Sequence, residues 1–295
     1  MTTSGQIYET HLLKLLDTTA IKIKHHPHTE KTAVIVDPRF TPLMEAVIYN
    51  FMFYMNPHGW NLLIYSAKEY QQQVKTKFPT AQFIPIPQKY IHYPEPSTPN
   101  MTITAYNNLF LDPEFWHSLP TKHITIFQTD CIMFKMFDPY FETIYAYSGA
   151  NYYNPAHISF YYGGINGGFS IRNRDIMLEC LKKITWDKIN DYRVAKIQEL
   201  QELHPHTHTH PHTHPQYKEE HAILNSMNED IFFTHACEML LKPVPDYFHR
   251  MFLAVETDPN ENTAVYHGWN KNYHTTAMAY NILEKSTLFH PLLQK

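Results

Sequence analysis

An aspartate and a histidine that lie far apart in the chain are candidates for metal chemistry. Asp130 follows an apolar run over 124–127, so we expect it just after a buried strand. His267 stands in the segment Tyr266-His-Gly-Trp269. Carboxylate and imidazole groups together suit Mn²⁺. An aspartate at that place is also a common turn residue, and most of the 21 histidines have no metal role to play, so structural roles stay open for both.

Two further carboxylates open a segment that we predict to be a helix over 229–241. Glu229 and Asp230 follow Asn228 directly. Acidic side chains in a first helical turn are stabilised by the helix dipole and by capping, which by itself would explain the pair. A carboxylate at that place is also kept ionised, and it could accept a proton from a hydroxyl group as a general base.

Glycine is concentrated in one part of the chain. Of the 8 glycines, five lie at Gly149, Gly163, Gly164, Gly167 and Gly168. We expect the two glycine pairs around Asn166 to leave backbone amides open beside a ligand, and a tight hairpin is the alternative. The segment is neither a G-x-G-x-x-G fingerprint nor a P-loop, because no strand–turn–helix order surrounds it and no G-K-[ST] follows.

Alternating apolar strands and helical segments must position these groups. We expect strands at 32–37, 60–65, 82–86 and 123–127, and helices at 43–55 and 68–77. This order predicts a parallel sheet, which binds ligands beyond the carboxyl ends of its strands. Asp37 and Arg39 follow the first strand, as Gln128 and Asp130 follow the fourth, so these side chains should meet at one edge.

The second half of the chain has a different pattern. We expect strands at 143–147, 169–172 and 252–256, and helices at 175–184 and 229–241. A histidine-rich loop covers 204–216, where alternating prolines exclude a helix. The predicted domains are an N-terminal helical extension over 1–30, one α/β domain over 31–275 and a tail over 276–295.

Composition excludes several classes of function. The formal net charge of -4 gives no electrostatic case for a nucleic-acid partner. No apolar run reaches the roughly 18 residues that a membrane span needs, and the start does not resemble a signal peptide, which predicts a cytoplasmic protein. Three scattered cysteines argue against a disulfide framework or a C-x-x-C zinc site.

Four segments in order resemble a glycosyltransferase-like family of GT-A type, catalogued as a domain of unknown function. They are residues 33–39, 127–130, 166–174 and 228–233, the last together with 255–256 and 267–269. The resemblance implies a nucleotide-diphospho-sugar transferase fold, with a mixed, mostly parallel sheet flanked by helices. It implies a hexosyltransferase-like enzyme with Mn²⁺ or Mg²⁺, a nucleotide-diphospho-sugar donor, and a glycan, protein or small-molecule acceptor.

The same resemblance implies roles for single residues. Asp230 would be the base of an inverting reaction, Glu229 would contact the sugars, and Asp130 with His267 would bind the metal. The nucleotide-sugar would lie against Asp37, Arg39, Gln128, Asp130, Asn166, Gly167, Gly168 and Arg172. Gln128-Thr-Asp130 stands in the place of a D-x-D motif and lacks its first acid. Tyr147–Asn151 departs from the acidic, tryptophan-bearing pattern of the family, which implies a different acceptor pocket.

Two other functions stay open. The missing first acid is compatible with a non-catalytic sugar- or partner-binding protein on a degenerate transferase fold. A nucleotidyltransferase fits the sequence less well, because residues 37–42, after the first predicted strand, hold no glycine for a phosphate-binding loop. The six histidines of 204–214 could bind zinc, nickel or copper without any link to the active site.

Overall fold

The strands of this protein form one mixed sheet. The computed structural model describes residues 2–17, 21–94, 98–151, 165–203, 228–255, 262–271 and 275–294. In these ranges nine strands pair in the order β3-β2-β1-β4-β7-β6-β8-β9-β5. Five neighbouring pairs are parallel and three are antiparallel, so the predicted mixed, mostly parallel sheet is confirmed.

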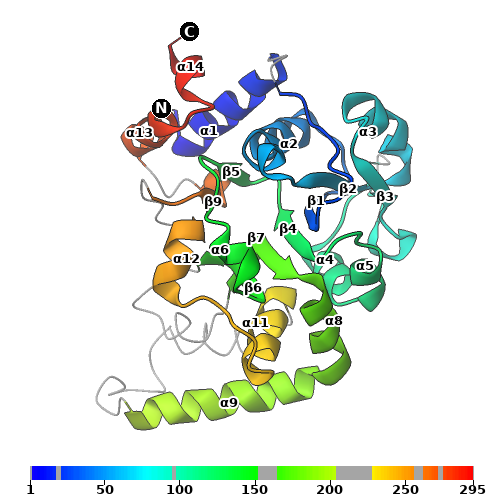
Figure 1. Ribbon diagram of the computed structural model, residues 1–295, viewed down its shortest axis with the longest axis vertical. Helices are drawn as coiled ribbons and strands as arrows, with labels where there is room; N and C mark the ends of the chain where they lie inside the picture. The colour runs from blue at the N-terminus through cyan, green and yellow to red at the C-terminus, as the bar shows by residue number, and fades with distance from the viewer. Residues whose placement is uncertain are drawn as a thin grey trace.

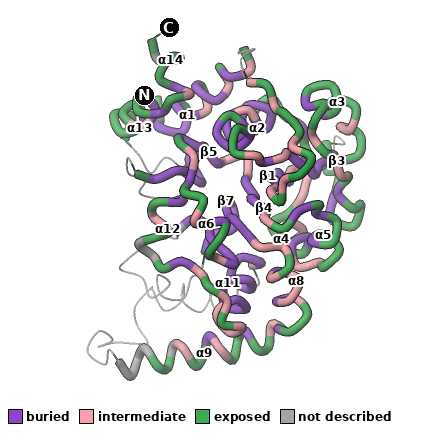
Figure 2. The backbone as a smooth tube through the Cα atoms, in the orientation of Figure 1, coloured by how far each residue is buried: buried purple, intermediate pink, exposed green. Residues whose placement is uncertain are grey.

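The strand bounds show which segments build this sheet. They are β1 (Lys31–Val36), β2 (Asn61–Ser66), β3 (Gln82–Pro85), β4 (His123–Phe127), β5 (Cys131–Met133), β6 (Tyr147–Asn151), β7 (Ile165–Asn173), β8 (Ala254–Val255) and β9 (Val265–His267). The long strands lie in the middle of the molecule and are buried along their length (Figure 2).

Helices cover both faces of the sheet, which gives a three-layer α/β architecture (Figure 1). Alternate residues of β1 show this: Ala33 and Ile35 belong to one core, and Val34 and Val36 to the other. The first core is covered by α1 (Ser4–Leu13), α2 (Pro42–Met55), α3 (Gln71–Lys77) and α13 (Thr276–Lys285). The second is covered by α4 (Ile103–Phe110), α5 (Pro113–His117), α8 (Arg174–Lys183), α9 (Trp186–Leu203) and α11 (Glu229–Met239).

The remaining helices of the described ranges are short. They are α6 (Tyr140–Thr143), α12 (Tyr247–Leu253), α14 (His290–Leu293) and the 3-10 turns Lys14–Asp17, Asn56–His58, Lys68–Tyr70, Gln88–Tyr90 and Trp269–Lys271. None of the helices in the described ranges is long and apolar enough to span a membrane. Both α1 and α13 pack side by side on the first core (Figure 1). We propose residues 31 and 275 as the limits of the sheet domain, with these two helices docked on it.

Residues 37–41 form a loop between β1 and α2, and the local sequence explains its bounds. Pro38 cannot donate a backbone hydrogen bond, so β1 stops at Val36. The next helix begins at Pro42, where a proline is favoured, and the Thr41 hydroxyl caps it by accepting the amide of Met44. Residues between the two elements therefore project beyond the carboxyl end of the strand.

Several predicted elements of the second half are wrong in type or extent. Residues 143–147 hold the end of α6 and only the first residue of β6. The strand predicted at 169–172 begins earlier, at Ile165, so Gly167 and Gly168 lie inside a strand. At 252–256 the helix α12 continues to Leu253 before β8. The histidine-rich loop over 204–216 lies outside the described residues.

Candidate functional site

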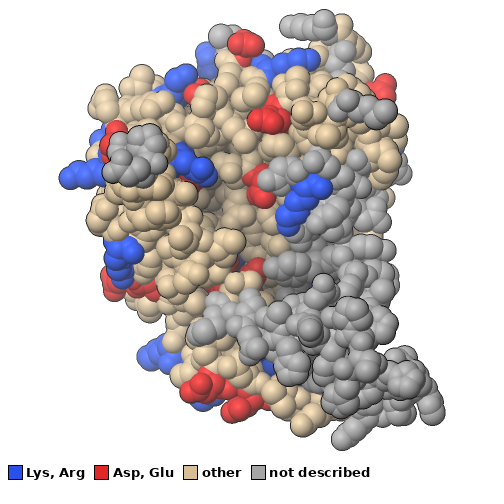
Figure 3. Space-filling model, turned by 180° about the vertical axis from the view of Figure 1, so that it is seen from behind, with Lys and Arg blue, Asp and Glu red and all other residues tan. Residues whose placement is uncertain are grey.

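A cavity of about 450 Å³ lies beyond the carboxyl ends of β1 and β4. The predicted site residues that line it are Asp37, Arg39, Gln128, Asp130, Asn166, Gly167, Gly168, Glu229, Asp230 and His267. They come from five separate parts of the chain, as the sheet topology requires. Seen from the side opposite to Figure 1, the surface is hollowed near its middle, with both acidic and basic side chains around the hollow (Figure 3).

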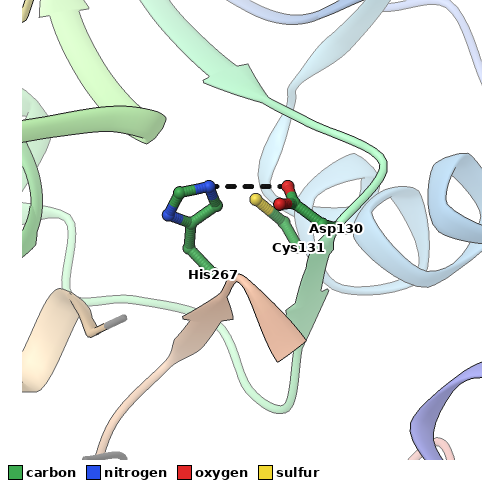
Figure 4. Close-up of side chains that lie close together, drawn as sticks. All are labelled: Asp130, Cys131 and His267. Carbon is green, nitrogen blue, oxygen red and sulfur yellow. Dashed lines mark ion pairs between the residues drawn. The ribbon is translucent and has the colours of Figure 1, made fainter. Parts of the chain in front are cut away.

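Asp130, Cys131 and His267 form a cluster of potential metal ligands at this cavity, which Asp130 and His267 line and beside which Cys131 is buried. His267 Nε2 lies 3.4 Å from Asp130 Oδ1. One ligand atom of each residue lies within 4.8 Å of the others, and the three side chains converge (Figure 4). Oxygen, sulfur and imidazole nitrogen are all donors to divalent transition metals. The cluster therefore fits a cation, and the predicted pairing of Asp130 with His267 is present.

The surroundings of Asp130 keep its side chain charged. Burial alone would raise the pKa of Asp130, but the interaction with the nearby His267 and the charge of Lys271 bring that pKa below its usual value. The backbone carbonyl of Asp130 also accepts the amide of Gly268 at 2.9 Å. An ionised carboxylate is thus fixed against the turn that follows β9.

Gly167 and Gly168 are glycines because other side chains occupy the space of a Cβ atom. A Cβ at Gly168 would lie 2.1 Å from His267 Nε2, and one at Gly167 would lie 2.4 Å from Glu229 Oε1. Glycine inside a strand often marks such a close approach. The expectation of open amides is wrong for this pair: the Gly167 amide donates to Asp230 Oδ2 at 3.2 Å, and the Gly168 amide donates to Asn166 Oδ1 at 2.8 Å. The other predicted pair, Gly163 and Gly164, lies outside the described residues.

Asp230 is held at the start of α11 by backbone donors. Its carboxylate accepts the amides of Gly167 at 3.2 Å and of Ile231 at 2.8 Å. The helix itself begins here because Asn107 of α4 accepts the amide of Glu229 at 3.2 Å and donates to Asn228 Oδ1 at 3.0 Å. A side chain from another helix thus replaces the local cap. Hydrogen bonds from amides favour the ionised form of a carboxylate.

Arg172 does not line the cavity, which corrects its predicted contact with the nucleotide-sugar. Its side chain is fully enclosed, and its Nη1 and Nη2 donate to the two oxygens of Glu229 at 2.5 and 2.9 Å. The guanidinium lies over the ring of Tyr147, 4.6 Å from its centroid. Both oxygens of Glu229 are therefore engaged by Arg172, and the pair anchors the first turn of α11 to β7.

Asp37 and Arg39 form an ion pair at the opposite wall. Arg39 Nε and Nη2 lie 3.2 and 3.4 Å from the two oxygens of Asp37, and the Arg39 amide donates to Asp37 Oδ1 at 2.9 Å. Asp37 is mostly buried, whereas nearly half of the Arg39 side chain is exposed. Each charge has a partner, and the guanidinium remains accessible from the cavity.

The sequence reasoning missed three residues at this site. Cys131 follows Asp130 directly, and that adjacency was the available signal. Lys271 lines the cavity four positions after His267. Tyr106 also lines it from α4, an element that the sequence reasoning did not predict. No pattern in the sequence connects Tyr106 with the site, because its place depends on how α4 packs on α11.

Comparisons with known proteins identify the family. The chain belongs to the family described as "Protein of unknown function (DUF5672)", whose model matches residues 90–271. The predicted membership of such a family is therefore confirmed. A search of curated proteins found no significant match.

Three solved structures illustrate the similarity of fold. Mouse xyloside xylosyltransferase 1 is 10% identical, with a TM-score of 0.44 over 83% of this chain and 99% of that one. The galactosyltransferase LgtC, in complex with donor and acceptor sugar analogs, is 11% identical, with a TM-score of 0.46 over 88% and 95%. The mannosyltransferase PcManGT from Pyrobaculum calidifontis, in complex with GDP-Man and Mn²⁺, is 10% identical, with a TM-score of 0.33 over 60% and 54%. At these identities the likeness concerns the fold alone.

Proposed function

We propose that this protein is a glycosyltransferase that moves a sugar from a nucleotide-diphospho-sugar to a hydroxyl acceptor with the help of a divalent cation. One observation carries the proposal: two consecutive glycines of β7 lie between the potential metal ligands and the carboxylate of Asp230. Gly168 packs against His267, which pairs with Asp130, and Gly167 donates to Asp230. A metal-binding group and a potential base thus border one cavity at the edge where α/β sheets bind ligands.

Asp130 and His267 would hold the cation, Mn²⁺ or Mg²⁺. When bound, such an ion supplies charge neutralisation for a diphosphate leaving group. The donor's nucleotide is proposed to lie along Asp37, Arg39 and Gln128, where the partly exposed Arg39 side chain offers guanidinium donors to phosphate oxygens. The cavity volume lies in the range of small-molecule sites.

Asp230 is the proposed general base of an inverting transfer. Its carboxylate would accept the proton of the acceptor hydroxyl as the oxygen attacks the anomeric carbon. Two backbone amides hold the carboxylate in place at the N-terminus of α11, where the helix dipole favours a negative charge. The Arg172–Glu229 pair then has a positioning role, because it fixes the helical turn that carries Asp230.

A second candidate is a non-catalytic sugar-binding protein on the same fold. The observation that favours it is Gln128, a neutral residue where a D-x-D motif has its first acid. A binding protein would retain a nucleotide-sugar without releasing nucleoside diphosphate, so one assay separates the two candidates.

The test is to incubate the purified protein with Mn²⁺ and each common nucleotide-sugar and to measure the release of nucleoside diphosphate. We expect slow release from one donor, reduced by about 100-fold or more in Asp130→Ala and Asp230→Asn. Asp175→Asn is the matched control, because Asp175 is an exposed first-turn aspartate of α8 outside the cavity. Donor binding without release would support the binding protein. Folded protein that neither binds nor cleaves any donor would refute both.

A further inference from the structure

Cys131 and His267 are cross-strand neighbours on one face of the sheet. The two residues are directly paired in the antiparallel ladder between β5 and β9. Side chains that are paired in this way project from the same face with close Cβ atoms. Asp130 lies in a turn, one residue before β5. Side chains of consecutive strand residues point to opposite faces, but this rule does not apply to Asp130, so its side chain can lie beside those of Cys131 and His267. The three side chains meet at one point (Figure 4).

The sulfur of Cys131 is held beside the imidazole by Gly168. Cys131 Sγ donates to the carbonyl of Gly168 at 3.3 Å, and the Cα of the same glycine packs against the His267 ring. Cys131 is fully buried and is not in a disulfide. Its thiol therefore has a fixed place next to the cluster, on the rigid sheet and not on a loop.

The spacing of the nitrogen and oxygen donors suits a cation between them. His267 Nε2 and Asp130 Oδ1 are 3.4 Å apart, which is longer than an ordinary N–H···O hydrogen bond of about 2.7–3.2 Å. Nitrogen and oxygen ligands at about 2.0–2.1 Å from a tetrahedral ion lie roughly 3.3 Å from each other. The distance thus matches two ligands of one ion with little movement of either side chain.

A thiolate at Cys131 would add negative charge to the cluster. Gln128 is neutral where a D-x-D motif has an acid, so Asp130 is the acidic residue that the Gln128-Thr-Asp130 segment supplies. A thiol that binds a metal gives up its proton, here to solvent, and the thiolate then adds a second negative charge. Cys131 would in this way replace the charge that the first acid supplies elsewhere.

We propose that Cys131 is a third protein ligand of this cation site and that the site therefore selects Zn²⁺ or Co²⁺ over Mg²⁺. Thiolate and imidazole ligands favour zinc and cobalt, whereas Mg²⁺ requires oxygen ligands in an octahedron. Mn²⁺ binds more weakly than Co²⁺ or Zn²⁺ to a given set of ligands. The inference replaces the Mn²⁺ or Mg²⁺ of the proposed transferase with Zn²⁺ or Co²⁺, and it rests on that function only for what the ion does. Binding itself is measured without any donor.

The test is to titrate the metal-free full chain with Co²⁺, without nucleotide-sugar, and to record the near-ultraviolet sulfur-to-cobalt charge-transfer band. We expect the band in the wild type, its loss on addition of Zn²⁺, and its persistence in a large excess of Mg²⁺. Cys131→Ser should abolish the band and weaken Co²⁺ binding by about 100-fold or more, since even outer-shell changes cost 10–100-fold.

Two other parts of the chain could bind Co²⁺, and controls separate them. Cys180 and Cys237 lie buried with their sulfurs 3.9 Å apart, so the Cys180→Ser/Cys237→Ser protein must keep the band. The histidines of 204–214 offer no sulfur and contribute no such band. Absence of the band in folded wild-type protein, or its survival in Cys131→Ser, would overturn the inference. A protein that shows the band but releases no nucleoside diphosphate would refute the transferase and leave the ligand assignment intact.

Discussion

Gly168 and His267 are packed so closely that one methyl group does not fit between them. A Cβ added at Gly168 would lie 2.1 Å from Nε2, 2.5 Å from Cε1 and 2.6 Å from Cδ2 of the imidazole. Non-bonded carbon contacts have their optimum at about 3.5–4.0 Å, so the ring would have to move by roughly 1.4 Å. In Gly168→Ala we therefore expect His267 to leave its place beside Asp130.

The cost should be that of an overpacked core. His267 is buried and lies between the β5–β9 ladder and β7, so a displaced ring has little room. Inserted methyl groups in such surroundings cost about 1–3 kcal/mol. We expect that loss in the free energy of unfolding, together with weaker binding of Co²⁺, because the 3.4 Å spacing to Asp130 is lost as well.

The assay is a double-mutant cycle measured by urea unfolding of the metal-free protein. Gly168→Ala should cost about 1–3 kcal/mol in the wild type and much less in His267→Ala, where the ring is absent, which gives a coupling above about 0.5 kcal/mol. Gly167→Ala is the matched control: its Cβ meets Glu229 and Arg172, so its cost should not depend on His267. Equal losses for Gly168→Ala in both backgrounds would refute the reasoning.

Three further changes test the surroundings of α11. Arg172→Met should lower the free energy of unfolding by about 3–5 kcal/mol, because Glu229 becomes an unpaired buried charge. Urea unfolding should show stability regained in Arg172→Met/Glu229→Met, and a double variant as unstable as the single one would contradict this. Asn107→Ala should lower the free energy of unfolding by about 1 kcal/mol in thermal unfolding, because it removes the acceptor for the first amide of α11. The control is Asn108→Ala at an exposed neighbouring residue, which should cost under about 0.5 kcal/mol. Equal costs would exclude the capping role. Burial would raise the pKa of Glu238, but hydrogen bonds from a neighbouring histidine and lysine lower that pKa to about 2. The ionised Glu238 therefore contributes its full stability above pH 4.5, the ordinary pKa of the group, and the contribution is lost as the pH falls toward 2. Glu238→Gln should therefore make unfolding less dependent on pH between 4.5 and 2, and an unchanged pH profile would argue against it.

Much of the first half of the fold could be predicted from sequence because β1, β2 and β4 are buried on both faces. A continuous apolar run such as 32–36, ended by Pro38, is a local signal that tertiary contacts only reinforce. The short strands β5, β8 and β9 have two or three residues each, too few for any periodicity. Their pairing depends on segments far away in the chain, which local patterns do not record.

The site divides in the same way. Asp130 could be predicted because it lies in the turn after an apolar strand, and Asp230 because it lies in the first turn of an apolar helix. The burial of Arg172 in an ion pair could not be predicted, because its partners Tyr147 and Glu229 come from other elements. The glycines were correctly expected at a close approach, but the approaching groups are protein side chains and not a ligand.

The place of β5 in the sheet also bears on how the protein folds during synthesis. Among the described strands its neighbour in the sheet is β9, near the far end of the chain. The ladder from β3 to β4 can pair early, while Asp130 and Cys131 must wait until the ribosome has released residues 265–267. Such distant pairing is slow, because a long loop has to close first. A cation that needs all three side chains would bind the finished sheet and none of its precursors, and by mass action it would favour the last step of folding.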